Sequence, residues 1–296
     1  MKLTKNIVSL TMKLSQLTPS KNISMLLKGA NGMGKTIAAC TFAAEGPVYV
    51  FDFDGRMLPV LTYFRKYCPE LLDNVNYDTY SSHNAHEFLN KLIDFTKDCR
   101  YNAVIVDSVT SLTASAVNWS LGFRSSKAKK SNEPNLIPDF DSYKVETSLV
   151  SQALDIMKTL SCHMIFTAHP LPSLSMSGSG SSMIVSKVTS IVSYGQKVGA
   201  IVPGYFNEIY HFARRVDYNN NTNKRVIFTD QIGDDYAKTA LDLPKEFDIT
   251  DKLFYQVWSE LVKKNKSEER GEENVEKTVE SEPLVNWKPP NVNWKV

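Results

Sequence analysis

The chain has 296 residues, of which 42% are hydrophobic and 22% are charged. This balance is typical of a chain that folds around a sizeable core, as one large domain or two small ones. Lys and Arg number 34 against 32 Asp and Glu, so the formal net charge is only +2. A strongly basic packaging protein is therefore excluded, although a local basic groove is not.

The four cysteines, Cys40, Cys68, Cys99 and Cys162, lie far apart and form no Cys-x-x-Cys or Cys/His ligand pattern. Their spacing argues against a zinc site and a disulfide framework and favours reduced thiols. The first residues lack the apolar run of a signal peptide, and no stretch approaches the length of a membrane span. We therefore expect a cytoplasmic protein without a membrane partner.

From Ile23 onward, short apolar runs alternate with longer helix-prone segments. The runs predict buried strands at residues 23–28, 48–51, 103–106 and 164–167. Helices are expected at residues 35–45, at 57–72 with breaks near Pro59 and Pro69, at 85–99 and at 145–160. Strands that alternate with helices predict an α/β fold with a mostly parallel central sheet flanked by helices.

The composition changes after Pro170, where residues 170–203 are rich in Ser and Gly and predict a long loop. Residues 208–217 and 224–230 then predict a late β-hairpin around Asn219-Asn220-Asn221, and residues 251–264 predict a last amphipathic helix. Beyond Lys264 the chain is charged and Glu-rich, which predicts disorder. The predicted organisation is an arm (1–22), a core domain (23–264) and a disordered tail (265–296) with a doubled Val-Asn-Trp-Lys element.

Residues 29–36 read Gly-Ala-Asn-Gly-Met-Gly-Lys-Thr and match G-x-x-x-x-G-K-[ST] at every position. The glycines let backbone N–H groups turn inward around phosphates, Lys35 adds a positive charge at the β/γ oxygens, and Thr36 offers a hydroxyl to Mg²⁺. The flanking strand and helix are the context that this motif requires. We therefore predict a site for ATP and Mg²⁺, with the nucleotide bound by Gly29, Ala30, Asn31, Gly32, Met33, Gly34, Lys35 and Thr36.

Acidic side chains follow two of the predicted strands. Asp107 ends the run 103–106 and is expected to hold Mg²⁺ with Thr36, while Ser108 or Thr110 could assist. Asp52 and Asp54 follow the run 48–51, and Asp54 is the preferred candidate to orient or deprotonate a water, because ligands bind at this edge of open α/β sheets. The alternative is that these acids only cap a helix or a loop.

His169 ends another predicted strand at the same sheet edge. Its position suits a sensor that detects the γ-phosphate and transmits its presence to the segment behind it, whereas the alternative is a purely structural histidine. The predicted catalytic residues are thus Lys35, Asp54, Asp107 and His169.

The order of these motifs resembles the RecA-like P-loop NTPase core, in which a phosphate loop precedes two acidic strand ends and a sensor strand. Residues 137–143 and 202–209 extend the resemblance to short phage-encoded ATPases of the Sak type, which act in single-strand annealing and recombination. The resemblance covers about residues 23–262. It implies a RecA-like fold, matches Asp54 to a catalytic Glu that is one methylene longer, and matches His169 to a phosphate-sensing Gln.

In such proteins two loops contact single-stranded DNA, and they correspond here to residues 113–142 and 170–203. Basic residues interleaved with aromatic ones suit backbone neutralisation and base stacking. The alternatives are a solvated charged loop and an inert connector. The resemblance also makes Lys238 a candidate to reach the nucleotide of a neighbouring subunit. The candidate DNA-binding residues are Arg124, Lys127, Lys129, Lys130, Lys187 and Lys197.

These features favour a DNA-stimulated ATPase that acts on single-stranded DNA in annealing, recombination or repair, in the host cytoplasm if it is phage-encoded. The expected partners are single-stranded DNA, further copies of the chain and, through the tail tryptophans, a single-strand-binding protein. Two other classes stay open, an oligomeric helicase-like motor and a small-molecule kinase. A kinase needs an arginine-rich lid, and the candidate segment 113–142 holds a single arginine.

Overall fold

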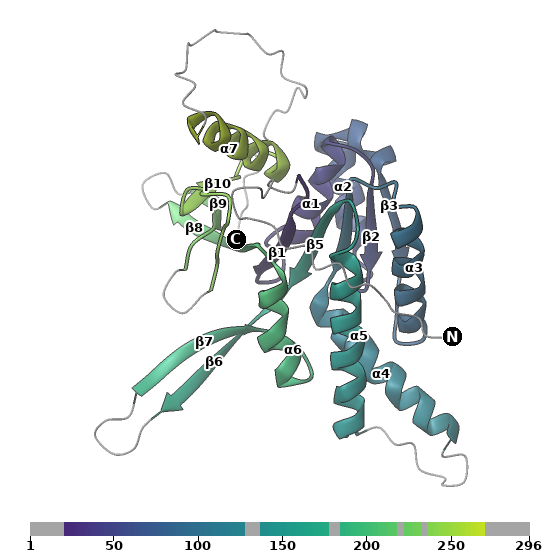
Figure 1. Ribbon diagram of the computed structural model, residues 1–296. Helices are drawn as coiled ribbons and strands as arrows, with labels where there is room; N and C mark the ends of the chain where they lie inside the picture. Colours follow the sequence, from purple (N-terminus) through teal and green to yellow (C-terminus); the bar gives the residue numbers. More distant parts are fainter. Residues whose placement is uncertain (1–20, 128–136, 178–183, 218–221, 232–235, 270–296) are drawn as a thin grey trace, which may run out of the picture.

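The computed structural model describes residues 21–127, 137–177, 184–217, 222–231 and 236–269. Most of the predicted arm, the turn at residues 219–221 and the tail from residue 270 onward lie outside the described residues. The centre of the fold is an eight-stranded sheet with the strand order β10-β9-β8-β1-β5-β4-β2-β3 (Figure 1).

Most neighbouring strands of this sheet run parallel, and only β9 and β10 add antiparallel pairs at one end. The parallel strands are β1 (Ser24–Gly29), β2 (Val48–Asp52), β3 (Val75–Thr79), β4 (Ala103–Asp107), β5 (His163–Ala168) and β8 (Glu208–Asp217). The antiparallel strands are β9 (Thr222–Phe228) and β10 (Glu246–Asp248).

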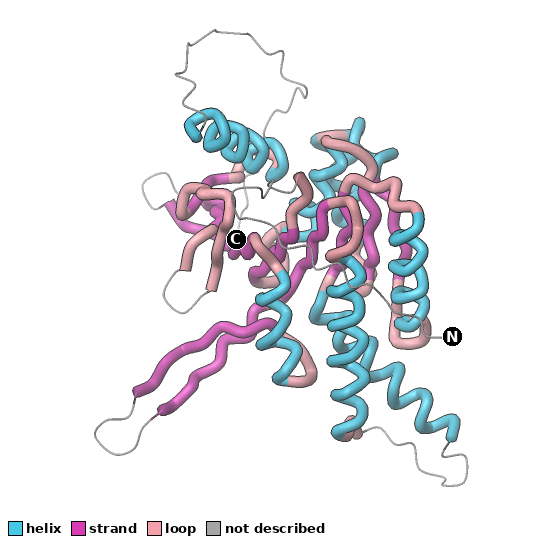
Figure 2. The backbone as a smooth tube through the Cα atoms, viewed as in Figure 1, coloured by secondary structure: helices cyan, strands magenta, loops and turns pink. Residues whose placement is uncertain are grey.

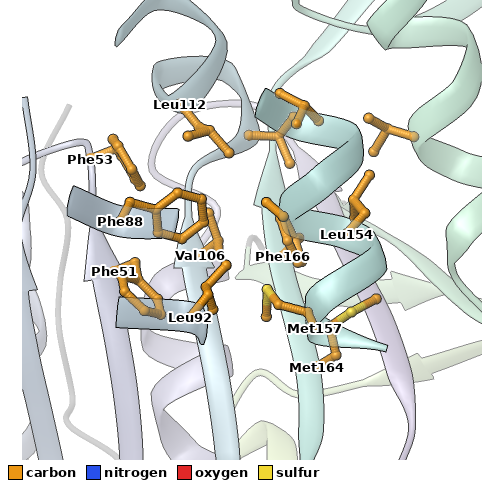
Figure 3. Packing of buried hydrophobic residues seen from close by; sticks show 14 of the residues in the cluster. Phe51, Phe53, Phe88, Leu92, Val106, Leu112, Leu154, Met157, Met164 and Phe166 are labelled. Carbon is orange, nitrogen blue, oxygen red and sulfur yellow. The ribbon is translucent and has the colours of Figure 1, made fainter. Parts of the chain in front are cut away.

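Helices cover both faces of the sheet. One face packs against α1 (Lys35–Cys40), α2 (Met57–Tyr67) and α7 (Phe254–Glu269). The other face packs against α3 (Ala85–Lys97), α4 (Val109–Lys127) and α5 (Phe140–Met157). Figure 3 shows Phe51, Val106 and Phe166 on this second face, next to side chains of α3 and α5.

The strands near the centre are buried on both faces because alternate side chains enter opposite cores. Met25 and Leu27 of β1 belong to the α1/α2/α7 core, whereas Leu26 belongs to the core of α3, α4 and α5. A strand buried on both sides reads as a continuous apolar run, which is why the sequence revealed it. The predicted α/β fold with a mostly parallel sheet, helices on its flanks and a late β-hairpin is confirmed.

The segment 57–72 is interrupted at only one of its two prolines. Helix α2 runs through Pro59 and ends at Tyr67, and a short 3₁₀ helix, η3 (Pro69–Asn74), follows. Pro59 lies in the first turn of α2, where its missing N–H has no intrahelical partner to lose. The expected break at Pro59 is therefore wrong, and the break at Pro69 is confirmed.

The prediction of one long loop over residues 170–203 is wrong. Strands β6 (Pro170–Ser177) and β7 (Ile184–Ile191) pair antiparallel, and α6 (Gln196–Ile201) and the 3₁₀ helix η5 (Val202–Tyr205) follow. Figure 2 shows the β6–β7 hairpin extending away from the main sheet. In Ser173-Leu174-Ser175-Met176-Ser177, apolar and polar residues alternate with the period of a strand, a signal that the high serine content obscured.

The predicted loop over residues 113–142 is also wrong for its described part, because α4 extends to Lys127 and α5 begins at Phe140. Val109, Leu112 and Ala116 form a buried stripe at helical spacing on α4. Asp139 caps α5, since its carboxylate accepts hydrogen bonds from the backbone N–H groups of Asp141 and Ser142. Helix α7 also continues past Lys264, where the sequence predicted the tail to begin.

Among the described helices, none combines the length and the apolar character that crossing a bilayer requires.

Candidate nucleotide-binding site

The phosphate loop connects β1 to α1 at the carboxyl edge of the sheet, as the motif predicts. Gly29 lies against β8, and a Cβ added there would stand 2.6 Å from the carbonyl oxygen of Phe212. Gly34 has a φ of 87°, a left-handed conformation that disfavours residues with a side chain. Glycine is therefore required at both positions for the loop to take this path.

The ammonium of Lys35 lies over this loop. Its Nζ donates hydrogen bonds to the carbonyl oxygens of Gly29 at 2.7 Å and Ala30 at 3.0 Å, and it lies 3.4 Å from Nδ1 of His169. Burial lowers the pKa of Lys35 to about 8, although the carboxylates of Asp107 and Asp54 act in the opposite direction. Within the described residues the ammonium forms no ion pair, so this buried positive charge is available to bind a phosphate oxygen.

Asp107, at the end of β4, is hydrogen-bonded by two hydroxyl groups. The Thr36 hydroxyl donates to Oδ2 at 3.0 Å, and the Thr167 hydroxyl of β5 donates to Oδ1. Burial raises the pKa of Asp107 to about 6, although these two hydrogen bonds oppose the effect. A buried carboxylate beside a threonine hydroxyl is a set of hard oxygen donors that suits Mg²⁺, so Thr36 and Asp107 fit the predicted metal role.

Asp54 lies in the loop after β2 and is hydrogen-bonded to the segment that follows β4. Its Oδ1 accepts a hydrogen bond from the Ser108 hydroxyl at 2.9 Å, and its Oδ2 lies 3.7 Å from Nε2 of His169. Burial alone would raise the pKa of Asp54, but hydrogen bonds from His169, Ser111 and Ser108 lower it to about 2. An ionised carboxylate with so low a pKa suits the orientation of a water better than full removal of its proton.

Asp52 has the loop-capping role that the sequence left open as the alternative. Its Oδ1 accepts hydrogen bonds from the backbone N–H groups of Asp54 at 3.1 Å, Gly55 at 2.7 Å and Arg56 at 3.3 Å. The chain turns directly after Asp52, where β2 ends, so the two acids do not lie on one extended segment. Asp52 thus shapes the loop that presents Asp54.

His169 connects the phosphate loop to the β6–β7 hairpin. Its ring lies between Lys35 and Asp54, and its backbone N–H donates to the hydroxyl of Thr110 at 3.3 Å. Its carbonyl oxygen accepts a hydrogen bond at 2.9 Å from Val192, which directly follows the hairpin. The structure therefore brings Lys35, Thr36, Asp54, Asp107 and His169 together around one loop.

The candidate DNA-binding residues are not gathered at this loop. Arg124 and Lys127 lie in the last part of α4, Lys187 lies in β7, and Lys197 lies exposed on α6. Lys129 and Lys130 lie outside the described residues. Lys238 is bridged to Ile209 near the start of β8, which is in register with Leu26 and not with Gly29, where the phosphate loop begins.

A groove of about 750 Å³ lies between α5 and the segment that follows β7. Phe140 and Tyr194 border it with 72% and 55% of their surfaces exposed. Lys197 adds positive charge, whereas the ammonium of Lys144 is paired with the Asp141 carboxylate at 3.2 Å. The Lys144 ammonium lies 4.5 Å from the centre of the Phe140 ring. The sequence predicted a loop at Lys197 but not the pairing of this segment with α5, because the pairing depends on tertiary structure.

The loop, the lysine and the paired threonine and aspartate define a P-loop nucleotide-binding protein. A family model described as AAA domain (AAA_24) matches residues 21–241, and the chain belongs to this family. No curated protein matches the sequence.

Two solved structures are similar to the chain at low identity. A KaiC-like protein from the archaeon Pyrococcus horikoshii OT3 is 16% identical, with a TM-score of 0.39, over 70% of this chain and 77% of that one. The flagellar accessory protein FlaH from Methanocaldococcus jannaschii is 12% identical, also with a TM-score of 0.39, over 76% of this chain and 84% of that one.

Proposed function

We propose that the protein is an ATPase that hydrolyses ATP and acts on single-stranded DNA in annealing or recombination. The observation that carries the ATPase part is the arrangement of Lys35, Asp107, Asp54 and His169 around one phosphate loop. Lys35 binds phosphate oxygens, Asp54 orients the attacking water, and Ser108 holds the Asp54 carboxylate in position. Thr36 and Asp107 would hold Mg²⁺, which would supply positive charge next to the phosphate oxygens.

The DNA part is supported by the groove between α5 and the segment Tyr194–Lys197. Exposed aromatic rings next to lysines suit a nucleic-acid strand, because bases stack on rings whatever their identity and lysines neutralise phosphates. The β6–β7 hairpin begins directly after His169 and ends directly before the segment that lines this groove. The hairpin therefore connects the phosphate loop region with the groove. We propose that His169 senses the γ-phosphate and that a displacement of His169 changes the shape of the groove.

Further copies of the chain and a single-strand-binding protein are the other proposed partners. Lys238 is the residue through which one subunit would reach the nucleotide of the next. It is half-buried, and its ammonium lies 5.9 Å from the centre of the Tyr236 ring. The tail element that we propose as a docking segment lies outside the described residues. Sizing and pull-down of the full chain against residues 1–269 test both associations.

The proposed function is tested by ATP turnover with and without single-stranded DNA. We expect turnover that rises when DNA is added, together with faster pairing of complementary strands. Unwinding of a duplex without annealing would favour the helicase-like motor instead. Phosphate transfer from ATP to a small molecule, with no effect of DNA, would favour the kinase.

A further inference from the structure

Two arginines of the late β-hairpin lie beside the phosphate loop, on the side of β1 that faces away from His169. In the sheet, β1 is flanked by β5, which carries His169 at its end, and by β8, which pairs next with β9. Strand β8 is in register with β1 up to Gly29↔Phe212 and then continues past the point where the phosphate loop begins. Arg214 follows on this continuation, and Arg225 of β9 is its direct partner across the hairpin.

Both side chains emerge on the face of the sheet where α1 packs. Phe212 and Ile227 contribute to the core on that face, and Arg214 and Arg225 lie two residues from them in the direction of the phosphate loop. A guanidinium nitrogen of Arg214 lies 3.5 Å from the carbonyl oxygen of Gly32. Nη1 of Arg225 lies 4.0 Å from the point where a Cβ on Gly34 would stand.

This pairing is electrostatically unfavourable in the free protein. Like charges directly opposite each other on neighbouring strands destabilise a sheet. Within the part of the chain that the structure describes, neither guanidinium forms an ion pair with a carboxylate. The adjacent Arg215 differs, because it forms a two-point ion pair with Glu246 of β10 at 2.7 and 2.6 Å.

We infer that Arg214 and Arg225 bind the α- and β-phosphates of the nucleotide from the side of the loop opposite His169. The inference rests on the proposed ATP site and extends it to residues outside the loop motif. The terminal phosphate is expected on the other side of the loop, where Lys35, Asp54 and His169 lie. The two arginines therefore face the α- and β-phosphates, which ATP and ADP have in common. A planar guanidinium suits phosphate oxygens because it presents parallel N–H donors.

The test is the affinity of the full chain for ATP and ADP, measured by calorimetry for R214Q, R225Q and the double variant. Each single change should raise the dissociation constants of ATP and ADP alike by roughly tenfold, as expected for one charged hydrogen bond. R215Q is the matched control, since this neighbouring arginine is already paired with Glu246, and it should bind both nucleotides like the wild type.

The possible failures can be told apart. A wild-type chain that binds neither nucleotide contradicts the proposed function itself. If the folded double variant binds ATP and ADP with wild-type affinity, the inference is overturned but the proposed ATP site is not. The same holds if the double variant loses affinity for ATP but not for ADP. If the double variant fails to fold, the single variants and R214K and R225K decide the question, because a lysine should recover part of the affinity that glutamine loses.

Discussion

Oδ2 of Asp54 lies 3.7 Å from Nε2 of His169, although the two residues follow strands that are not neighbours in the sheet. Strand β4 lies between β2 and β5, and its following residue, Ser108, donates a hydrogen bond to the same carboxylate. The loop after β2 therefore bends over the end of β4 to reach the sensor position. This contact joins the carboxylate proposed to orient water to the histidine proposed to sense phosphate.

Asp54→Asn should reduce ATP turnover by roughly 10²-fold, because the attacking water loses the carboxylate that orients it. Nucleotide affinity should change little, because the Asp54 carboxylate points toward Ser108 and His169 rather than into the phosphate loop. Steady-state turnover and calorimetry measure the two quantities separately. Asp98→Asn, at an exposed site, is the control, and unchanged turnover in Asp54→Asn would make Asp54 a structural residue.

His169→Ala should uncouple ATP turnover from single-stranded DNA. The His169 ring contacts Lys35 and Asp54, and its carbonyl oxygen is bonded to the residue at the base of the hairpin. We expect basal turnover to persist in part while the stimulation by DNA is lost. The ratio of turnover with and without DNA measures this, with the exposed His83→Ala as control. Full stimulation in His169→Ala would exclude the sensor role.

The groove should bind a nucleic-acid strand through stacking and charge. Tyr194→Ala and Phe140→Ala should each weaken binding by roughly 1–3 kcal/mol per stacked base. Lys197→Gln should lower the slope of log affinity against log salt by roughly 0.7. Fluorescence titrations at several salt concentrations measure both effects. Tyr77→Ala, an exposed aromatic on the edge strand β3, is the control, and equal effects there would disprove a specific groove.

Glu146 should make the stability of the fold depend on pH. Its buried carboxylate accepts hydrogen bonds from the N–H groups of Tyr194 at 3.1 Å and Gly195 at 2.8 Å, and so holds the wall of the groove. Burial raises the pKa of Glu146 to about 6, although these hydrogen bonds oppose the effect. The folded chain thus binds the proton more tightly than the unfolded chain, whose glutamates titrate near pH 4.5.

The free energy of unfolding should therefore fall as the pH rises from about 4.5 to about 6, by roughly 2 kcal/mol from this residue. Denaturant titrations across this range, for the wild type and Glu146→Gln, measure the difference. In Glu146→Gln the free energy of unfolding should fall by about 2 kcal/mol less over this pH range than in the wild type. The control Glu87→Gln, at an exposed site on α3, should show the same fall as the wild type. Parallel profiles for the wild type and Glu146→Gln would show that the carboxyl group titrates normally.

The parts of the fold that the sequence revealed are those with strong periodic or motif signals. Strands β1, β2, β4 and β5 are continuous apolar runs, and the phosphate loop is specified residue by residue. Strand β3 was not predicted, because it lies at the edge of the sheet with most of its residues half-buried or exposed. The serine content of the β6–β7 hairpin obscured the alternation of apolar and polar residues that is typical of a strand.

The candidate site was predictable as a set of residues but not in its detailed roles. The spacing of Asp52 and Asp54 could not show that β2 ends at Asp52 and that this carboxylate caps the loop. Thr167, which bonds Asp107, was visible only as part of a strand. Arg214 and Arg225 lie far from the motif in sequence and approach it through the pairing of β8 with β1, so only the sheet order reveals them.

The most direct test of the ATP site is nucleotide binding and hydrolysis by Lys35→Ala. Among the described residues, the ammonium forms hydrogen bonds with the carbonyl oxygens of Gly29 and Ala30 and contacts His169, so its removal should leave the fold intact, as circular dichroism can verify. Lys97→Ala, which removes an exposed lysine paired with Asp94, is the control. We predict that Lys35→Ala loses ATP binding or hydrolysis while Lys97→Ala keeps both. Undiminished ATP turnover by folded Lys35→Ala protein would contradict the assignment of this loop as the catalytic nucleotide site.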